Sequence, residues 1–367
     1  MSRNIVVCCD GTGNKVTVNE NSNIVHLFAC LEKSSQQLCY YSPGLGTTTP
    51  LWVDNERSKE WFKFKAMVSG YSLKNNVLDA YKFIMENYND EDKIYFFGFS
   101  RGAYTVRVVA GIIRMFGILQ KGNTAHMEQL YNLYENYINK ELKRDIENGL
   151  VGRNRISGHV KIVARIKSSF SRGEGKIAFM GLWDTVSSVG NVFFSKSNLP
   201  YTYDLKYIKS VRHAVAIDEK RKKFRFQKVN PNTHKDLKEV YFAGVHSDIG
   251  GSYPEEGLSK ISLVWMLGEA SGLGLRLDKK KVDKYVFGIG GKFQPPDHLQ
   301  QIHNSYKGIF KFFCPQSREI SIGSLIHHSV AIKKKIDKSY KPENLKCLSN
   351  IEFDKEIVYY QKGNKNE

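Results

Sequence analysis

A chain of 367 residues, 41% of them hydrophobic and 12% aromatic, can bury a sizeable core, which excludes a disordered or low-complexity protein. The apolar stretch before Asp10 is too short for a signal peptide, and no later stretch reaches about 18 apolar residues. We therefore expect cytoplasmic synthesis without a signal peptide. The net charge of +18 favours a polyanionic partner, an anionic membrane or a nucleic acid, or serves solubility alone.

Strands and helices are predicted to alternate along the first 275 residues. In chain order we expect strand 4–9, helix 23–32, strand 37–41, helix 72–88, strand 93–97, helix 103–115, helix 124–148, strand 176–182, helix 205–216, strand 239–244 and helix 259–270. This alternation predicts an α/β fold with a mostly parallel sheet and helices on both faces. Residues 276–367 are expected to form a small basic appendage or cap outside a catalytic domain of residues 1–275.

The sequence Gly98-Phe-Ser-Arg-Gly102 lies between a predicted buried strand and a predicted helix. In that context G-x-S-x-G indicates a nucleophile elbow, as in α/β-hydrolases, because the two glycines allow a turn too tight for side chains beside the serine. The hydroxyl of Ser100 is then raised above the sheet as a candidate nucleophile. The alternative is a serine that only caps an ordinary helix.

A serine hydroxyl needs a base to remove its proton and an acid to orient the base. Ser100, Asp184 and His246 follow the chain order of this fold, and each comes after a predicted strand. We expect His246, at the head of a flexible glycine-rich turn, to be the base. His213, expected within a helix beside the positive charge of Arg212, is the rival or packs nearby. Asp184 could instead cap a turn.

The loop after the first strand, residues 10–14, is predicted to complete the site. Its glycines leave backbone N–H groups accessible near the sheet edge. We expect the oxyanion to be held by the N–H of Arg101, at the start of the helix, together with the N–H groups of Gly11 and Thr12.

Asp10 has several possible roles. It could orient His246 or the loop itself. Asp10-Gly-Thr after a first strand also resembles aspartate-nucleophile phosphatases, but these need a second aspartate where Cys8 stands. Asp10, Asp184, His246 and Asp248 could converge on a metal ion, although nothing in their spacing demands one. We expect no metal and no cofactor.

Five sequence blocks occur together in one order. They are residues 7–14, 97–105, 181–186, 212–219 and 241–251. They resemble the uncharacterised α/β-hydrolase family that includes the first class of type VI secretion lipase effectors. The resemblance covers about residues 3–275 and implies an α/β-hydrolase core and phospholipase A-type activity, with the nucleophile, acid and base at Ser100, Asp184 and His246. Effector members often carry larger C-terminal membrane-associating regions than this chain.

The function expected from these features is a serine esterase that hydrolyses acyl esters of phospholipids. Its expected partners are the lipid substrate, an anionic membrane surface and, by resemblance, a secretion-system or immunity protein, but not a nucleic acid. Such a protein would be a secreted effector or peripheral at a membrane, and residues 306–313, with two lysines among four aromatics, are a candidate membrane-surface element. The alternative is a catalytically idle, basic binding module for a nucleic acid or a membrane.

Overall fold

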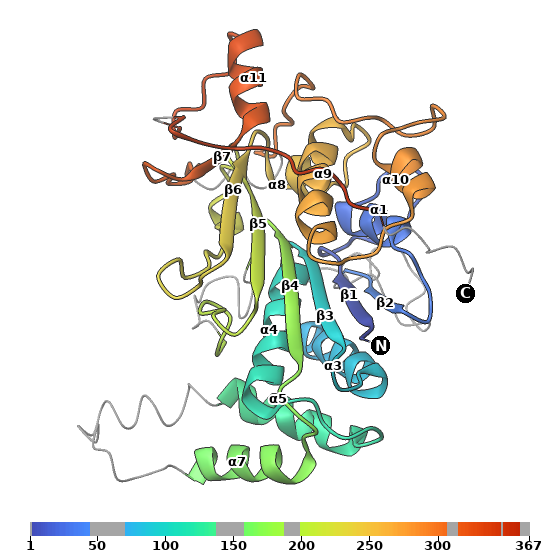
Figure 1. The fold of residues 1–367 in the computed structure, drawn as a ribbon. Coiled ribbons are helices and arrows are strands. Elements are labelled where there is room, and N and C mark those ends of the chain that lie inside the picture. The colour runs from blue at the N-terminus through green and yellow to red at the C-terminus, as the bar shows by residue number, and fades with distance from the viewer. Residues whose placement is uncertain are drawn as a thin grey trace, which may run out of the picture.

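The computed structural model describes residues 2–44, 70–136, 158–186, 199–306, 315–345 and 348–359, which fold around one eight-stranded sheet (Figure 1). The strands are β1 Asn4–Cys9, β2 Gln37–Ser42, β3 Lys93–Phe99, β4 Lys176–Trp183, β5 Ser210–Ala216, β6 Leu237–Phe242, β7 Leu325–His327 and β8 Asn350–Glu352. Their order across the sheet is β2-β1-β3-β4-β5-β6-β7-β8, and each of these neighbouring pairs is parallel. The predicted α/β class and parallel sheet are therefore confirmed.

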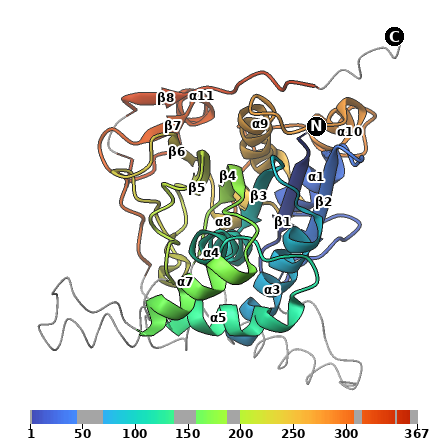
Figure 2. The same ribbon diagram turned by 60° about the horizontal axis from the view of Figure 1, so that its bottom comes forward.

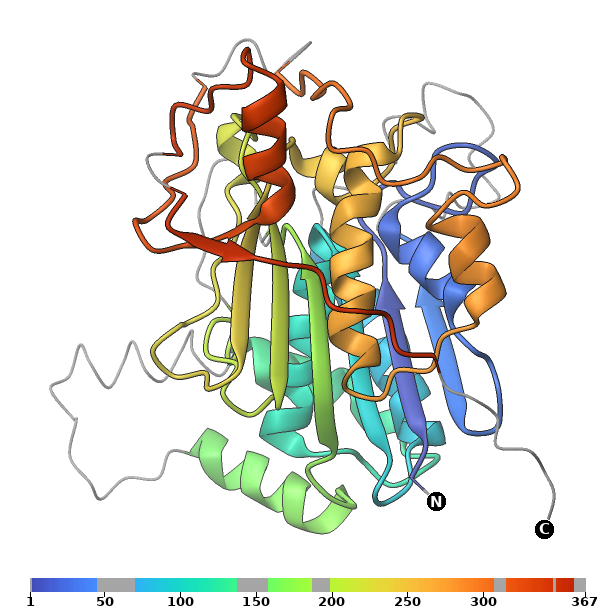
Figure 3. The ribbon, with the colours of Figure 1, turned by 45° about the horizontal axis from the view of Figure 1, so that its top comes forward.

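Helices cover both faces of the sheet. The α-helices are α1 Asn23–Cys30, α3 Gly70–Asn87, α4 Arg101–Phe116, α5 Met127–Asn136, α7 Gly158–Phe170, α8 His246–Gly250, α9 Gly257–Ser271, α10 Lys279–Tyr285 and α11 His328–Ile336, and short 3-10 turns are η1 Thr124–His126 and η3 Lys222–Phe224. The helices α3, α4, α5 and α7 lie on one face (Figure 2), whereas α1, α9 and α10 lie on the other (Figure 3). In the described part of the chain, no helix is long and apolar enough to cross a membrane.

The central strands are buried on both faces. In β1, Ile5 and Val7 belong to the core beneath α3 and α4, while Val6 and Cys8 belong to the core beneath α1 and α9. Successive side chains of a strand point to opposite faces, so a strand covered twice must be apolar throughout. The continuous apolar runs in the sequence follow from this arrangement.

One predicted element is wrong. Residues 205–216 were expected to be helical, but Ser210–Ala216 form β5 between β4 and β6. Every residue of β5 is buried, so the strand lacks the alternation by which a half-buried strand is recognised. Its three polar residues are buried with partners: Ser210 donates to Asp236, Arg212 contacts Glu269, and His213 contacts Glu239. Of the predicted helix 124–148, the described part is η1 and α5.

The C-terminal segment extends the same sheet. Strands β7 and β8 come from residues after 275 and add two strands beside β6 (Figure 3). The chain after β8 then returns toward α9, where the Val358 amide donates to the Ser271 hydroxyl at 3.0 Å. The division at residue 275 stays a prediction. The candidate membrane element 306–313 lies almost wholly outside the described residues.

Candidate active site

The register of the sheet brings the ends of its central strands to one edge. It pairs Cys9 with Gly98, Phe99 with Trp183, Trp183 with Ala214 and Ala216 with Phe242. Asp10, Ser100 and Asp184 directly follow β1, β3 and β4, and His246 begins α8 shortly after β6. Parallel strands thus place four polar residues, far apart in sequence, along one edge, where ligands bind in open α/β sheets.

Ser100 occupies a strained turn between β3 and α4. Its backbone has φ 56° and ψ −121°, a conformation that L-residues rarely adopt. A Cβ at Gly98 would lie 2.5 Å from Ala103 Cα, and one at Gly102 would lie 2.2 Å from the Cys9 carbonyl oxygen. The turn therefore has the tightness expected of an elbow. Ser100 is only 7% exposed, less open than the raised hydroxyl we expected.

A chain of hydrogen bonds joins Ser100, His246 and Asp184. The Ser100 Oγ lies 2.9 Å from His246 Nε2, and His246 Nδ1 lies 2.5 Å from Asp184 Oδ2. The rings of Phe99 and Phe224 lie against the imidazole, with centroids 4.7 and 5.1 Å away. Both ring nitrogens of His246 thus have a partner, which fixes the orientation of the ring. In this arrangement the imidazole can accept a proton from the serine while the carboxylate stabilises the charge.

Asp184 is a fully buried carboxylate with three donors besides His246. The Ala216 amide donates to Oδ1 at 3.0 Å, and the Arg318 guanidinium donates to both carboxylate oxygens, Nη2 to Oδ2 at 2.8 Å. Burial would raise the pKa of Asp184, but the positive charge and hydrogen bonds of Arg318, with His246, outweigh it and lower that pKa far below its usual range. Asp184 is therefore held as an anion.

Arg318 is a site residue that the sequence analysis missed. It is buried, and besides Asp184 it donates to the Ala216 carbonyl at 3.0 Å and to the Phe224 carbonyl at 2.9 Å. Burial disfavours the guanidinium, but Asp184 more than compensates, so the pKa of Arg318 is raised. No motif surrounds residue 318, so only the fold could show that this arginine reaches the edge of the sheet.

His246 is the first residue of a short helix, not part of a flexible turn as expected. Its amide donates to Glu219 Oε2 at 3.2 Å. Asp248 accepts from the Val245 amide at 3.0 Å and pairs with His303, whose Nδ1 is 2.6 Å away. Burial raises the pKa of Asp248, although these hydrogen bonds oppose the shift. Two carboxylates therefore hold the backbone of the segment that carries His246: Glu219 accepts from the His246 amide, and Asp248 accepts from the Val245 amide.

His213 lies within β5, between β4 and β6, and not at the carboxyl ends of the strands where Ser100 and His246 lie. It is fully buried; its Nδ1 is 2.9 Å from Glu239 Oε2, and its Nε2 accepts from the Thr185 amide at 3.2 Å. Burial lowers the pKa of His213, with Glu239 opposing the shift. Because Nε2 accepts a backbone hydrogen bond, the ring supports the loop that carries Asp184. The histidine that contacts Ser100 is His246.

Asp10 organises its own loop. It accepts hydrogen bonds from the Ser22 hydroxyl at 2.7 Å, the Tyr41 hydroxyl at 2.9 Å, the Asn14 amide at 3.1 Å and the backbone N–H of Gly11 at 2.6 Å. Burial nevertheless raises the pKa of Asp10. Of the two roles we left open, these bonds favour orientation of the loop. Of the four candidate metal ligands, the structure joins Asp184 directly to His246, while Asp10 and Asp248 have the other partners given above.

The expected oxyanion donors lie at the start of α4 and in the loop after β1. Arg101 is the first residue of α4, where backbone N–H groups point out of the helix end. Its side-chain Nε contacts the Thr12 hydroxyl, which ties the loop to the helix. The Gly11 N–H points to Asp10, so it would have to exchange that acceptor to bind an oxyanion.

Comparison with known proteins places the chain in a family. The model for the catalytic domain of Tle1-like phospholipase effectors of the type VI secretion system matches residues 3–269. The uncharacterized protein YEL023C of Saccharomyces cerevisiae is 34% identical over 230 residues, which are 61% of this chain and 32% of that protein. This chain thus spans about a third of the length of that curated relative.

Two solved structures show weaker similarity. An uncharacterized protein from Pseudomonas aeruginosa has 17% identity and a TM-score of 0.42, covering 81% of this chain and 49% of that one. The Tle1 effector bound to the VgrG spike of the type VI secretion system has 18% identity and a TM-score of 0.37, covering 69% and 51%. The family model, which spans well over half of the sequence, agrees with the resemblance of the five sequence blocks, and the chain belongs to the family of Tle1-like phospholipase effector catalytic domains.

Proposed function

We propose that this protein is a serine esterase that hydrolyses acyl esters of phospholipids, an activity of the phospholipase A type. The supporting observation is the continuous set of contacts Ser100–His246–Asp184, with Ser100 on a strained strand-to-helix turn. Family membership supports the lipid substrate, since the matched model is that of a phospholipase catalytic domain.

The mechanism we propose is acyl transfer through Ser100. His246 Nε2 takes the hydroxyl proton as Oγ attacks the ester carbonyl, and then gives that proton to the leaving alcohol. Asp184 stabilises the imidazolium that forms between these steps, because its carboxylate stays ionised beside Nδ1. Water, activated by the same histidine, attacks the acyl-enzyme and releases the fatty acid. No cofactor takes part in these steps.

The tetrahedral oxyanion would be held by backbone N–H groups. The proposed donors are the N–H of Arg101 at the start of α4 and an N–H of the Gly11–Thr12 loop. The close approach of Gly102 to the backbone of Cys9 and Asp10 supports this pairing, because it holds the helix start against the loop. Removal of one such donor in other enzymes costs about 100- to 1000-fold in kcat.

Arg318 is proposed as a positioning residue for the acid. It holds both oxygens of Asp184 and the two backbone carbonyls beside it, so the carboxylate has little freedom to turn away from His246. Bidentate pairing of a guanidinium with a carboxylate fixes geometry as well as charge. Residues beyond the matched catalytic domain would therefore complete the site.

The biological setting follows from the family and is also a proposal. A secretion-system component or an immunity protein, and an anionic membrane that carries the substrate, are the partners to test. The protein would act as a secreted effector or at a membrane surface.

A covalent probe tests the mechanism. A fluorophosphonate should label the wild-type protein at Ser100, because the reagent reacts only with an activated serine, and it should label neither the Ser100→Ala nor the His246→Ala variant. Products from phosphatidylcholine, phosphatidylethanolamine and phosphatidylglycerol vesicles, analysed by mass spectrometry, would give head-group preference and acyl position. An unlabelled, folded wild-type protein would favour the idle binding module instead.

A further inference from the structure

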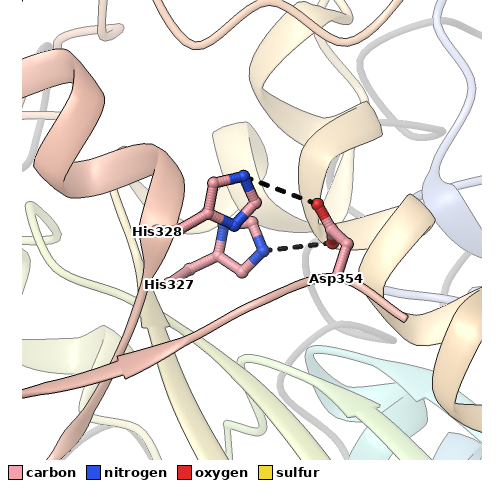
Figure 4. A group of neighbouring side chains, drawn as sticks. All are labelled: His327, His328 and Asp354. Atoms are coloured by element: carbon pink, nitrogen blue, oxygen red, sulfur yellow. Dashed lines mark hydrogen bonds and ion pairs between the residues drawn. The ribbon is translucent and has the colours of Figure 1, made fainter. Parts of the chain in front are cut away.

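The described part of the chain brings together one group of three side chains of metal-binding type outside the proposed catalytic site. His327 ends β7, His328 begins α11, and Asp354 follows β8 (Figure 4). These strands are the last two in the sheet order, at the opposite end from β2. The proposed esterase mechanism uses none of the three.

The topology explains why they meet. β7 and β8 are parallel, so their carboxyl ends lie side by side, and His327 pairs with Glu352, two residues before Asp354. Both imidazoles turn a ring nitrogen toward the Asp354 carboxylate (Figure 4). The Nε2 atom of His327 lies 3.1 Å from Oδ1, and Nε2 of His328 lies 3.7 Å from Oδ2.

These distances suit a small ion after minor adjustment. One ligand atom from each residue lies within 4.8 Å of the other two. In a tetrahedral zinc site with bonds of about 2.0–2.1 Å, neighbouring ligand atoms are about 3.3 Å apart. The partly exposed side chains of His328 and Asp354 can supply the needed movement, since their exposed fractions are 27% and 31%.

Neighbouring side chains hold the two rings in place. The Nδ1 atom of His327 accepts from the Ser329 amide at 3.4 Å and lies 2.9 Å from the Ser329 hydroxyl, so the start of α11 holds this ring with Nε2 toward Asp354. Phe242 stacks on His327 with centroids 4.5 Å apart, and Phe353 stacks on His328 at 5.4 Å. Nδ1 of His328 is buried with no hydrogen-bond partner among the described residues.

We propose that His327, His328 and Asp354 bind one divalent transition-metal ion, with Zn²⁺ as the best-suited ion and water completing its coordination. Two imidazoles and one carboxylate match the ligand preference of zinc and iron(II), whereas Ca²⁺ and Mg²⁺ prefer oxygen ligands alone. The ion would join the start of α11 to the chain after β8. Since β8 is a three-residue strand, this cross-link would hold the C-terminal segment on the sheet.

Metal binding to the full chain, freed of any affinity tag, tests the proposal. We expect one Zn²⁺ per chain by isothermal titration calorimetry, and a rise in melting temperature with Zn²⁺ that Mg²⁺ does not produce. Co²⁺ should give the intense visible bands of a tetrahedral site. His328→Ala and Asp354→Asn are the test variants because both side chains are partly exposed, so the fold should survive their replacement. His126→Ala, a partly exposed histidine on η1, is the matched control.

Zn²⁺ binding by the variants shows whether these three residues hold the ion. Loss of a ligand should weaken Zn²⁺ binding by more than the roughly 10- to 100-fold typical of outer-shell partners, and should abolish the Co²⁺ bands, while His126→Ala binds as wild type. Circular dichroism would show that each variant is folded. Absence of saturable Zn²⁺ binding by the wild type, or equal binding by all four proteins, would overturn the proposal. So would loss of binding in His246→Ala alone, because the ion would then be at the esterase site.

Discussion

Replacement of Arg318 by alanine is the most informative single perturbation of the site. The change removes two hydrogen bonds and the positive charge from Asp184, a carboxylate with no exposed surface. Among the described residues, the Ala216 amide and His246 then remain as its donors. Loss of one partner of a buried ion pair typically costs about 3–5 kcal/mol, a large fraction of the roughly 5–15 kcal/mol that stabilises a domain.

The activity should fall less than in a variant without the acid. In a serine protease, replacement of the triad aspartate lowers kcat by about 10,000-fold. Asp184 would still be present in Arg318→Ala but would be less well oriented. We therefore expect kcat/KM on a short soluble ester to fall about 10- to 100-fold, the loss typical when a residue that orients a metal ligand is replaced in a metalloenzyme. Millimolar guanidinium, far below denaturing concentrations, should restore part of the rate by filling the vacated space.

The dependence on pH gives a second, independent signature. In the wild type, the net effect of burial and Arg318 lowers the pKa of Asp184, so its stabilising contribution is present above its unfolded pKa near 4 and is lost as pH falls. Without Arg318, burial should instead raise the pKa of Asp184. The stability difference between the two proteins should therefore be larger at pH 8 than at pH 5, and the acid limb of the variant's rate profile should move to higher pH.

A second arginine–carboxylate pair provides the control. Arg3 contacts the buried Asp92 at 2.7 Å. These two residues directly precede β1 and β3, so they lie at the amino ends of the strands, whereas the candidate site lies at the carboxyl ends. Arg3→Ala should lower the unfolding free energy in urea but leave kcat/KM at the wild-type value. Wild-type kcat/KM and an unshifted pH profile in Arg318→Ala would refute the positioning role.

The remaining predictions concern the nucleophile, the base and the elbow. Ser100→Ala should lose ester hydrolysis by several powers of ten while its melting curve stays close to wild type, and retention of more than about a tenth of the turnover would contradict the nucleophile assignment. His246→Ala should be as inactive as its double variant with Ser100→Ala, whereas His213→Ala should lose mainly thermal stability; the reverse pattern would exchange their roles. Gly102→Ala should destabilise the protein and reduce activity, because its Cβ would lie 2.2 Å from a backbone oxygen. Gly158→Ala, whose Cβ would meet no atom of the described residues within 4 Å, should be neutral or slightly stabilising in urea unfolding.

The sequence was sufficient for the parts of the molecule with local signals. Ser100 stands in a five-residue motif between a buried strand and a helix, and the motif carries its own backbone requirement. Asp184 and His246 were found by chain order and by their places after strands, and the structure puts both within hydrogen-bond reach of their expected partners. Their catalytic roles stay predictions until the variants are assayed.

Other parts depend on tertiary contacts that no local pattern encodes. The strand β5 was mistaken for a helix because burial on both faces removes the alternation of polar and apolar residues. For the same reason His213 was expected in a helix, whereas it lies in a strand with its Nδ1 beside Glu239. Arg318 lies 134 residues from Asp184, and a single arginine in a basic tail gives no sign of a buried partner.

The extent of the catalytic unit follows from these long-range contacts. The family model ends at residue 269, yet Arg318 supplies charge to Asp184, and His303 pairs with Asp248 beside the start of α8. A buried carboxylate without compensation is costly, so an Asp184 site of this form requires the later segment to be in place. β7 and β8 meet that requirement because they attach the segment to the sheet beside β6. We therefore infer that residues after 275 are part of the candidate site as well as of the sheet. Contacts that stabilise β8, the last strand of the sheet, would then also help to keep Arg318 on Asp184.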